Sequence, residues 1–411
     1  MRTCQDGRRV GGTSTAHCLD FCPNDPNLAS SKKLRGLWPS SRMSSMLAER
    51  STPLGPVLLA STCCRLSIRC WRMNPEVAAR QWNLDGDIER IATGRINATF
   101  LVGGTHVLQR INGDIFPDPR ALLRNAEKIA AVAGKLIVRH LPSKHGEPCW
   151  SDQDGEVWRV YPHVPSRNFD TLPDALLNPV GTIFGDLLSR LRALDGELET
   201  SIPGFHDIQT YLNYLDATRS SGDADAELEY VDLRRQRLVV SEEKSQIIHG
   251  DCKVNNVLFD PTTDKAIKVV DLDTLMRGSA SWDFGDLIRS ISVGPEELTP
   301  DAHINIAGVE AVSRGFLSAY GPVSNVEEYA AAPAHMSFML GTRFLTDHFD
   351  GDRYFGATRR GENLERARAQ FALTRQFDRS VERLCEILAH AMGQRLDAAA
   401  KPLRKVRFRF W

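Results

Sequence analysis

The stretch HGDCKVNNVLFDPTTDKAIKVVDLDT, residues 249–274, predicts a short β-hairpin with candidate catalytic residues at one end. Its segments NVLFD and KAIKVVD flank the polar turn PTTD, the pattern of two strands joined by a tight connection. Asp251 and Asn256 stand five residues apart before the first strand, and Asp271 follows the second. Because the strands of a hairpin are antiparallel, Asp271 returns to the end at which Asn256 lies. We therefore expect three oxygen-bearing side chains to converge in one cleft.

Carboxylate and amide oxygens suit Mg²⁺, a hard cation that binds one or two carboxylates and completes its shell with water and phosphate oxygens. Phosphoryl transfer needs such an ion and a group that orients or deprotonates the attacking hydroxyl. The pattern assigns Asp251 as the base, and Asn256 and Asp271 as catalytic residues that ligate the metal. The alternative is that all three are turn residues, since Asp and Asn are frequent in turns. Their combination with His249-Gly250 favours the metal site.

The segments HGDCKVNNVLFD and VVDLDT resemble the phosphotransferases of the aminoglycoside phosphotransferase and choline kinase superfamily. GRINATFLV, VLQRINGDIFPDP, VVDLDTLM, WDFGDLIR and RFLTDHFDGDRYF are similar to the N-acetylhexosamine 1-kinase branch, and the resemblance spans roughly residues 90–375. It implies an α+β protein with the two-lobed protein-kinase-like fold: a small β-rich N-lobe and a larger, mainly helical C-lobe. It also implies ATP and Mg²⁺ as cofactors, and transfer of the γ-phosphoryl group to a sugar hydroxyl.

The motif WDFGDLIR, residues 282–289, contains the triplet Asp283-Phe284-Gly285 that would mark the metal-binding aspartate of a protein kinase. In the kinase-like arrangement, however, that aspartate ends the strand after the catalytic loop, where Asp271 stands. Asp283 and Asp286 open a helical pattern, so we expect them to cap that helix and bind the free backbone donors of its first turn. For Asp273 we favour a role in the local turn over metal binding through water.

The periodicity of the remaining chain predicts a small sheet with one helix over 80–161, followed by a helical region. Strands are expected at 94–102 and 105–111 across the turn Gly103-Gly104, and at 156–164. A helix is expected to begin at Asp118-Pro119. Further helices are predicted near 172–196, 206–218, 301–320, 325–348 and 362–395. We therefore place a nucleotide-binding N-lobe at 73–163 and a C-lobe with the catalytic loop and substrate site at 164–411.

The nucleotide site is assigned by the resemblance to residues of the N-lobe. Gly94 and Asn97 lie in the connection that would cover the phosphates. Arg110 stands where a protein kinase has its strand lysine, and an arginine can bind phosphate oxygens bidentately. Its expected partner is Glu127 on the following helix. Adenine would bind the backbone around Tyr161 to Val164.

The acceptor site is assigned to the segment GTRFLTDHFDGDRYF, residues 341–355, where the resemblance suggests that Arg343 and Tyr354 face the sugar. The alternative for Arg343 is a salt bridge to Asp347, one helical turn away. His348 occupies a position where the family pattern leads us to expect an aromatic residue. His206 is equally compatible with a structural hydrogen bond and with a ligand contact.

Bulk properties are those of an ordinary globular protein, with 42% hydrophobic and 25% charged residues and a net charge of −1. This charge gives no general attraction to nucleic acid or membrane, so we expect neither as a partner, and a cytoplasmic monomer or homodimer. Residues 1–72 hold six of the nine cysteines, many Ser, Gly and Pro, and no sustained periodicity. We interpret them as a disordered or spurious N-terminal extension.

Two other functions remain open from the sequence. A kinase for another hydroxyl compound, such as an aminoglycoside, an amino alcohol or homoserine, would keep Asp251, Asn256 and Asp271 and differ in the helical lobe. A non-catalytic binding module on the same fold is the other. A module without catalysis has no chemical reason to keep all three residues together, which favours an enzyme.

Overall fold

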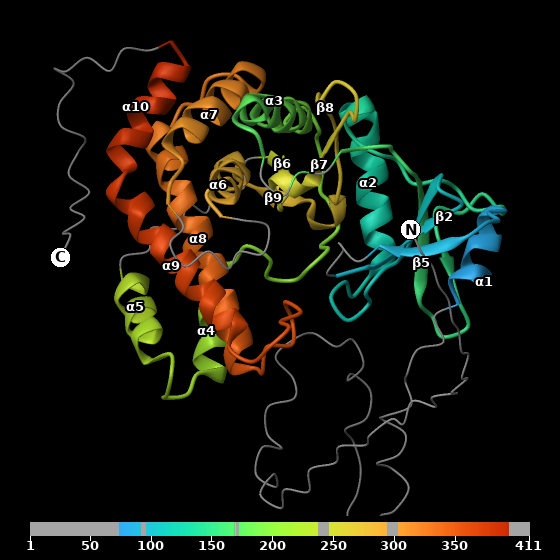
Figure 1. Cartoon of the computed structure of the whole chain (residues 1–411), viewed down its shortest axis with the longest axis horizontal. Helices are drawn as coiled ribbons and strands as arrows, with labels where there is room; N and C mark the ends of the chain where they lie inside the picture. The colour runs from blue at the N-terminus through green and yellow to red at the C-terminus, as the bar shows by residue number, and fades with distance from the viewer. Residues whose placement is uncertain are drawn as a thin grey trace, which may run out of the picture. The chain divides into compact units, whose positions relative to one another are not determined.

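The computed structural model describes residues 74–91, 96–167, 169, 172–236, 246–293 and 303–393 (Figure 1). The predicted extension 1–72 and Gly94 lie outside these residues. The described part of the chain has a sheet-based N-lobe and a helical C-lobe, which confirms the α+β, two-lobed fold. Among the helices in this part, none has the length and apolar character needed to cross a membrane.

The N-lobe is built on an antiparallel five-stranded sheet in the order β1-β2-β3-β5-β4. Its strands are β1 (Ile88–Ile91), β2 (Ala98–Val102), β3 (His106–Arg110), β4 (Trp150–Ser151) and β5 (Val157–Pro162). The predicted hairpin is β2–β3, whose turn residues Gly103 and Gly104 have φ of 56° and 68°. Glycine adopts positive φ without the steric cost that other residues meet, so this pair allows the tight reversal.

The two faces of this sheet are used differently. One face packs against the short helix α1 (Pro75–Ala79) through Phe100, Leu108, Trp158 and Val160. Successive side chains of a strand alternate, so Gln109, Arg159 and Tyr161 belong to the other face. That face carries α2 (Pro119–Ala133), whose Leu122 and Leu123 pack against Val157. As predicted, α2 starts at Asp118, whose carboxylate accepts a hydrogen bond from Arg120 N at 3.0 Å.

The C-lobe consists mainly of helices. They are α3 (Asp174–Leu191), α4 (Ile208–Thr218), α5 (Asp225–Arg235), α6 (Ala280–Ser290), α7 (Ile306–Tyr320), α8 (Val326–Phe349), α9 (Glu362–Arg379) and α10 (Val381–Ala391). The helix predicted over 362–395 is two helices, because the chain breaks at Ser380. Helix α5 was not predicted, since it is rich in charge and Val231 is its single buried residue.

Helices α3 and α7 approach so closely that glycines on each helix contact the backbone of the other. A Cβ atom on Gly181 would lie 2.2 Å from the carbonyl oxygen of Val312, and one on Gly315 would lie 2.1 Å from that of Asn178. Real Cβ atoms do not come so close to other atoms, so glycine is required at both positions. Helix α3 also contacts β6 (Gln246–Ile248) and β8 (Ala266–Val269), so the pair supports the segment that contains Asp251 and Asp271.

That segment forms two small antiparallel sheets between α3, α6 and the N-lobe (Figure 1). β6 (Gln246–Ile248) pairs with β9 (Met276–Gly278), and β7 (Val257–Phe259) pairs with β8 (Ala266–Val269), which confirms the predicted hairpin. The hairpin also contacts the N-lobe, because Val269 forms an isolated bridge with Ile137 and Lys268 Nζ donates to the carbonyl of Lys135.

Candidate active site

Asp251 lies in the loop between β6 and β7, and two features give this loop its shape. Gly250 has φ of 81°, and a Cβ there would lie 2.4 Å from the carbonyl oxygen of Thr274. The buried carboxylate of Asp283, on α6, accepts hydrogen bonds from the backbone N–H groups of His249 at 2.7 Å and Gly250 at 2.9 Å. The backbone of the loop is therefore held on both sides.

The prediction that Asp283 and Asp286 cap their own helix is wrong. Ser279 is the N-cap residue of α6, with its side chain accepting from Ser281 N. Asp283 binds backbone donors of the neighbouring loop instead, and Asp286 forms an ion pair with Arg289 at 2.8 Å. Sequence spacing missed this because the donors lie 33 and 34 residues away along the chain.

Asp251 is held by its neighbours in an ionised state. Its carboxylate lies 2.9 Å from Lys253 Nζ and accepts a hydrogen bond from Asn256 Nδ2 at 3.0 Å. Burial alone would raise the pKa of Asp251, but the Lys253 ammonium and the bond from Asn256 outweigh it, and the pKa is lowered. The structure thus brings Asp251 and Asn256 together as predicted. Lys253 was missed, although it stands two residues after Asp251.

Asp271 begins the one-turn helix η4 (Leu272–Thr274) in the left-handed conformation, with φ of 63°. Val270 N donates to the carbonyl of Asn256 at 2.9 Å, which brings Asp271 beside Asn256. Crowding by protein atoms and the carboxylates of Asp273 and Asp251 raise the pKa of Asp271 to about 6. Asp271 is nevertheless an exposed residue, so negative charges are gathered around an open carboxylate.

These residues fit a magnesium ion. Among the described residues, no hydrogen-bond donor contacts Asp271 or Asn256 Oδ1, so both offer free oxygens to one side of the loop. A cation would also relieve the repulsion between Asp271 and its neighbouring carboxylates. The same part of the chain contains no group of three or more His, Cys, Asp or Glu side chains that could hold a metal. An ion here would therefore need oxygens from water and nucleotide to complete its shell.

On the nucleotide side, the predicted pair of Arg110 and Glu127 is wrong. Glu127 forms an ion pair with Arg139, and the Arg110 guanidinium lies 3.9 Å from Glu156. The alternation of β3 explains the error, because Arg110 has the phase of Leu108, which packs towards α1. Gln109 instead belongs to the face that carries α2.

The cation on that face is Arg159 of β5, which was not predicted. Its guanidinium binds both carboxylate oxygens of Asp273 at 2.7 Å, and both side chains are almost fully buried. Asn97 Nδ2 donates to the same carboxylate at 2.8 Å. The side chain of Asp273 therefore connects its turn to the N-lobe, beyond the local role favoured from the sequence. The sequence VWRVY did contain a signal for Arg159, because a residue between the core residues Trp158 and Val160 must lie on the opposite face of the strand.

Tyr161 follows on the same face of β5, with its ring centroid 5.2 Å from the guanidinium carbon of Arg159. Burial, together with the Asp273 and Asp271 carboxylates, raises the pKa of Tyr161 to about 12, so its phenol is neutral. Beyond β5, the N–H of His163 is bonded to the carbonyl of Thr105 at 2.8 Å. Pro162 has no N–H. The next N–H, at Val164, has no hydrogen bond to another described residue.

On the acceptor side, Arg343 of α8 lies inside a cage of aromatic rings. Its guanidinium carbon is 5.1–5.8 Å from the ring centroids of Phe205, Tyr211, Tyr354 and Phe355. Its hydrogen bond to the Tyr354 hydroxyl is long, at 3.4 Å, and its buried Nε has no hydrogen-bond partner among the described residues. The structure therefore brings the two predicted substrate residues together. Arg343 is also close enough to Asp251 for their charges to interact.

The alternative salt bridge from Arg343 to Asp347 is not formed, because Asp347 holds the loop after α8. Its buried carboxylate accepts hydrogen bonds from the backbone N–H groups of Arg353 at 2.9 Å, Tyr354 at 2.8 Å and Phe355 at 3.0 Å. Asn363 Nδ2 adds a fourth at 2.8 Å. The position of Tyr354 beside Arg343 is thus set from Asp347.

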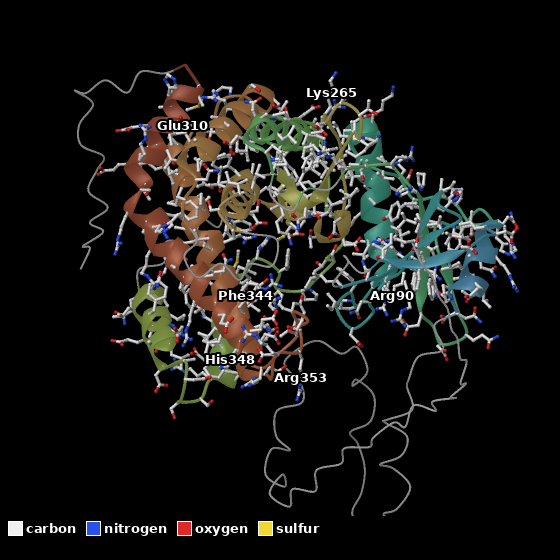
Figure 2. The ribbon with its side chains drawn as sticks, in the orientation of Figure 1. Arg90, Lys265, Glu310, Phe344, His348 and Arg353 are labelled. Atoms are coloured by element: carbon white, nitrogen blue, oxygen red, sulfur yellow. The ribbon has the colours of Figure 1, made fainter. Side chains whose placement is uncertain are left out.

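Two histidines flank the acceptor side. His206 has φ of 57°, and its Nε2 lies 2.7 Å from the carbonyl of Gly250, which confirms a structural hydrogen bond. Burial, and the Arg343 charge, lower the pKa of His206 to about 4, so it is neutral and Nε2 is the donor. His348 is buried near the end of α8, with Nε2 3.2 Å from Asp223 (Figure 2).

Residues 87–324 match the profile of the phosphotransferase enzyme family, which is more than half of the 411-residue chain. The chain belongs to this family. It is therefore an enzyme, a phosphotransferase. The loop with Asp251 and Asn256 and the turn with Asp271 both lie within the matched residues.

Solved structures of other proteins have a similar fold. A microcompartment-associated aminopropanol kinase superposes with a TM-score of 0.56 at 16% identity, over 76% of this chain and 98% of the other. An aminoglycoside phosphotransferase from Alicyclobacillus acidocaldarius gives 0.51 at 13% identity, over 79% and 100%. The GDP complex of aminoglycoside 2′-phosphotransferase-IIIa gives 0.50 at 14%, over 70% and 93%. At these identities the similarity shows the fold alone.

Proposed function

We propose that this kinase transfers the γ-phosphoryl group of ATP to the anomeric hydroxyl of an N-acetylhexosamine. The observation that supports this acceptor is Arg343, a half-buried residue near Asp251 whose buried Nε has no hydrogen-bond partner among the described residues. An arginine is always charged and has only hydrogen-bond donors, so it favours acceptors that bring neutral or anionic oxygens. The carbonyl of an acetamido group and the hydroxyls of a sugar are such oxygens.

The aromatic cage strengthens the preference against cations. Rings arranged around a positive charge are a common way to bind an ammonium ligand. Here the protein's own guanidinium occupies that place, between Phe205, Tyr211, Tyr354 and Phe355. An aminoglycoside or amino alcohol would bring a second positive charge towards Arg343. Acetylation of an amino sugar removes that charge.

The remaining residues have the following proposed roles. Asp251 accepts the proton of the attacking hydroxyl, and Lys253 keeps Asp251 ionised. Asn256 and Asp271 hold magnesium, which when bound neutralises charge on the phosphates. Adenine binds backbone near Tyr161 and Val164. Four residues, Gly94, Asn97, Arg110 and Glu127, stay predictions for the nucleotide site. Arg110 and Glu127 are the less supported of these, because Glu127 is paired with Arg139 and Arg110 belongs to the strand face that packs towards α1.

A second candidate is a kinase for an amino alcohol. The structural similarity to the aminopropanol kinase favours it. Glucosamine and N-acetylglucosamine separate the two proposals, because they share every ring hydroxyl and differ in whether the nitrogen is a cation or an amide.

The test is magnesium-dependent transfer from labelled ATP, with GTP in parallel because a similar structure was solved with GDP. Acceptors are N-acetylglucosamine, N-acetylgalactosamine, glucosamine, kanamycin, 1-amino-2-propanol and homoserine. We expect transfer to an acetylated sugar, with kcat/KM at least about tenfold above glucosamine, and phosphorus NMR showing an anomeric phosphate. Preferential transfer to a cationic acceptor would overturn the proposal. In Arg343→Met, the acceptor KM should rise while the KM for ATP is unchanged.

A further inference from the structure

The carboxylate of Asp273 joins three segments that are distant in the sequence. Arg159, from β5, donates to Oδ1 and Oδ2 at 2.7 Å each. Asn97, which directly precedes β2, donates to Oδ2 at 2.8 Å. Asp273 itself belongs to η4, the turn that begins after Asp271. The nucleotide lobe and the turn with the proposed metal ligand are thus tied at one side chain.

The partners of Asp273 are themselves held in place. Gln109 Oε1 accepts from Arg159 Nε at 3.1 Å and from Nη2 at 2.9 Å, and Gln109 Nε2 donates to Thr99 at 3.1 Å. Asn97 Oδ1 accepts from the backbone N–H of Asn112 at 3.0 Å. Each connection ends on a strand of the N-lobe sheet or within two residues of one. A displacement of Asp273 relative to this sheet would break several bonds at once.

Stability alone does not account for this pair. The exposed fractions of the Arg159 and Asp273 side chains are 4% and 3%, so both charges have lost their hydration. A buried ion pair commonly contributes no more to folding than a well-packed apolar pair of the same volume. What an apolar pair cannot provide is direction: a bidentate guanidinium–carboxylate pair fixes both distance and orientation.

We propose that Asp273 is a positioning residue of the metal–nucleotide site. Held by Arg159 and Asn97, it sets the place of Asp271 relative to the N-lobe, where the nucleotide binds, without ligating the metal itself. This inference rests on the proposed roles of Asp271 and Asn256. Loss of a residue that orients a metal ligand typically lowers metal affinity or activity 10- to 100-fold.

The test uses Arg159→Met, Asp273→Leu and the double variant. The double variant removes both buried charges together, so it should fold with a melting temperature near that of the native chain. Mn²⁺ affinity is measured by electron paramagnetic resonance with a non-hydrolysable ATP analogue, and KM is measured separately for ATP and the acceptor. We expect the double variant to lose about 10- to 100-fold in Mn²⁺–nucleotide affinity, with the acceptor KM unchanged.

The matched control is Arg234→Met with Asp378→Leu. This pair is also bidentate and partly buried, and it connects α5 to α9, away from the site. It should leave Mn²⁺ affinity and both KM values unchanged. Asn97→Ala, which removes one bond to Asp273 and leaves the ion pair intact, should weaken Mn²⁺–nucleotide binding several-fold even if the buried variants fail to fold.

The outcomes are distinct. Equal losses in the two single variants and the double variant support positioning through the pair. If Arg159→Met keeps Mn²⁺ affinity while Asp273→Leu loses it, Asp273 is a metal ligand and the inference is overturned. Native affinity in the folded double variant also overturns it. If the native chain binds no Mn²⁺ with nucleotide, the proposed metal site itself fails.

Discussion

At the scale of single residues, the proposed chemistry depends on an ionised Asp251. Lys253 at 2.9 Å and the amide of Asn256 at 3.0 Å both favour the carboxylate form. This lowers the pKa of Asp251 and leaves it deprotonated near neutral pH. The residue can therefore accept a hydrogen bond, and then a proton, from an incoming hydroxyl.

Asp251→Asn should lower single-turnover transfer from labelled ATP by 10²- to 10⁴-fold, the range for losing a general base. An anomeric hydroxyl is more acidic than an alkyl alcohol, so we expect the lower end of that range. Binding of the magnesium–nucleotide complex should survive, because Asn256 and Asp271 remain. An unchanged rate of transfer in this variant would remove Asp251 from its proposed role.

The lowered pKa of His206 predicts that the free energy of unfolding decreases in acid. Its folded-state pKa of about 4 lies below the usual 6.5, because burial and Arg343 disfavour the imidazolium form. The contribution of His206 to the free energy of unfolding is thus fully present above about pH 6.5, where the side chain is neutral in both states. It falls by up to about 3 kcal/mol as the pH drops towards 4, because the unfolded chain is protonated first.

The measurement is the free energy of unfolding by denaturant at pH 7 and pH 4.5, for the native chain and His206→Asn. Asparagine tolerates the left-handed backbone of this position and has a donor, but it does not titrate. The native chain should lose more stability in acid than the variant. The half-buried His335, whose pKa is also lowered to about 4, is common to both and cancels in the comparison. Equal losses would contradict the assignment.

At the scale of elements, α8 positions the acceptor site with two residues on one helix. Arg343 projects into the aromatic cage, and Asp347 holds the loop that supplies Tyr354 and Phe355. The catalytic loop is supported independently, by Asp283 on α6. In the proposed mechanism, acceptor binding and catalysis therefore depend on different helices.

Asp347→Ala should raise the acceptor KM about tenfold or more and leave the KM for ATP unchanged, because it releases three backbone N–H groups of the loop. Steady-state kinetics with each substrate varied in turn provide the measurement. Asp260→Ala is the control: its carboxylate also accepts from backbone N–H groups, at Thr262 and Thr263, in the exposed turn of the β7–β8 hairpin. A rise in both KM values for Asp347→Ala would indicate general disruption instead.

The contact between α3 and α7 gives a prediction on stability. Gly315→Ala should lower the free energy of unfolding by about 1–3 kcal/mol, because its Cβ would overlap the carbonyl of Asn178 and force the helices apart. Gly113→Ala is the control, since no atom lies within 4 Å of a Cβ there. Denaturant unfolding of both variants tests this, and equal stability would show that the helices can separate without cost.

Sequence patterns predicted those elements and contacts that depend on nearby residues. The hairpin turn at Gly103-Gly104, the start of α2 at Asp118 and the approach of Asn256 to Asp251 each arise within a few positions. The bonds of Asp283 to the catalytic loop and of Arg159 to Asp273 connect residues 33 to 114 positions apart, and no local pattern contains that information. The errors at Arg110 and Glu127 have the same origin, because the face of the sheet to which Arg110 belongs is defined by the pairing of β3 with β5.

At the scale of the whole molecule, the described residues contain every part of the proposed site except Gly94. The family match begins at residue 87, and α1 begins at Pro75 after its cap Asn74. A chain that starts at Met73 should therefore fold and transfer phosphate at the rate of the full chain. Melting temperature and kcat/KM of the two forms are the measurements. An insoluble or inactive short form would show that residues 1–72 contribute to the structure or the site.

The way Asp347 holds its loop has a consequence for how this enzyme could change its substrate. All three loop donors are backbone N–H groups, at Arg353, Tyr354 and Phe355. Every amino acid except proline supplies that group. The side chains at these positions can therefore be exchanged in evolution or in a mutant library while the anchor is retained. A library over 353–355 that omits proline should give variants with altered acceptor preference and intact folding.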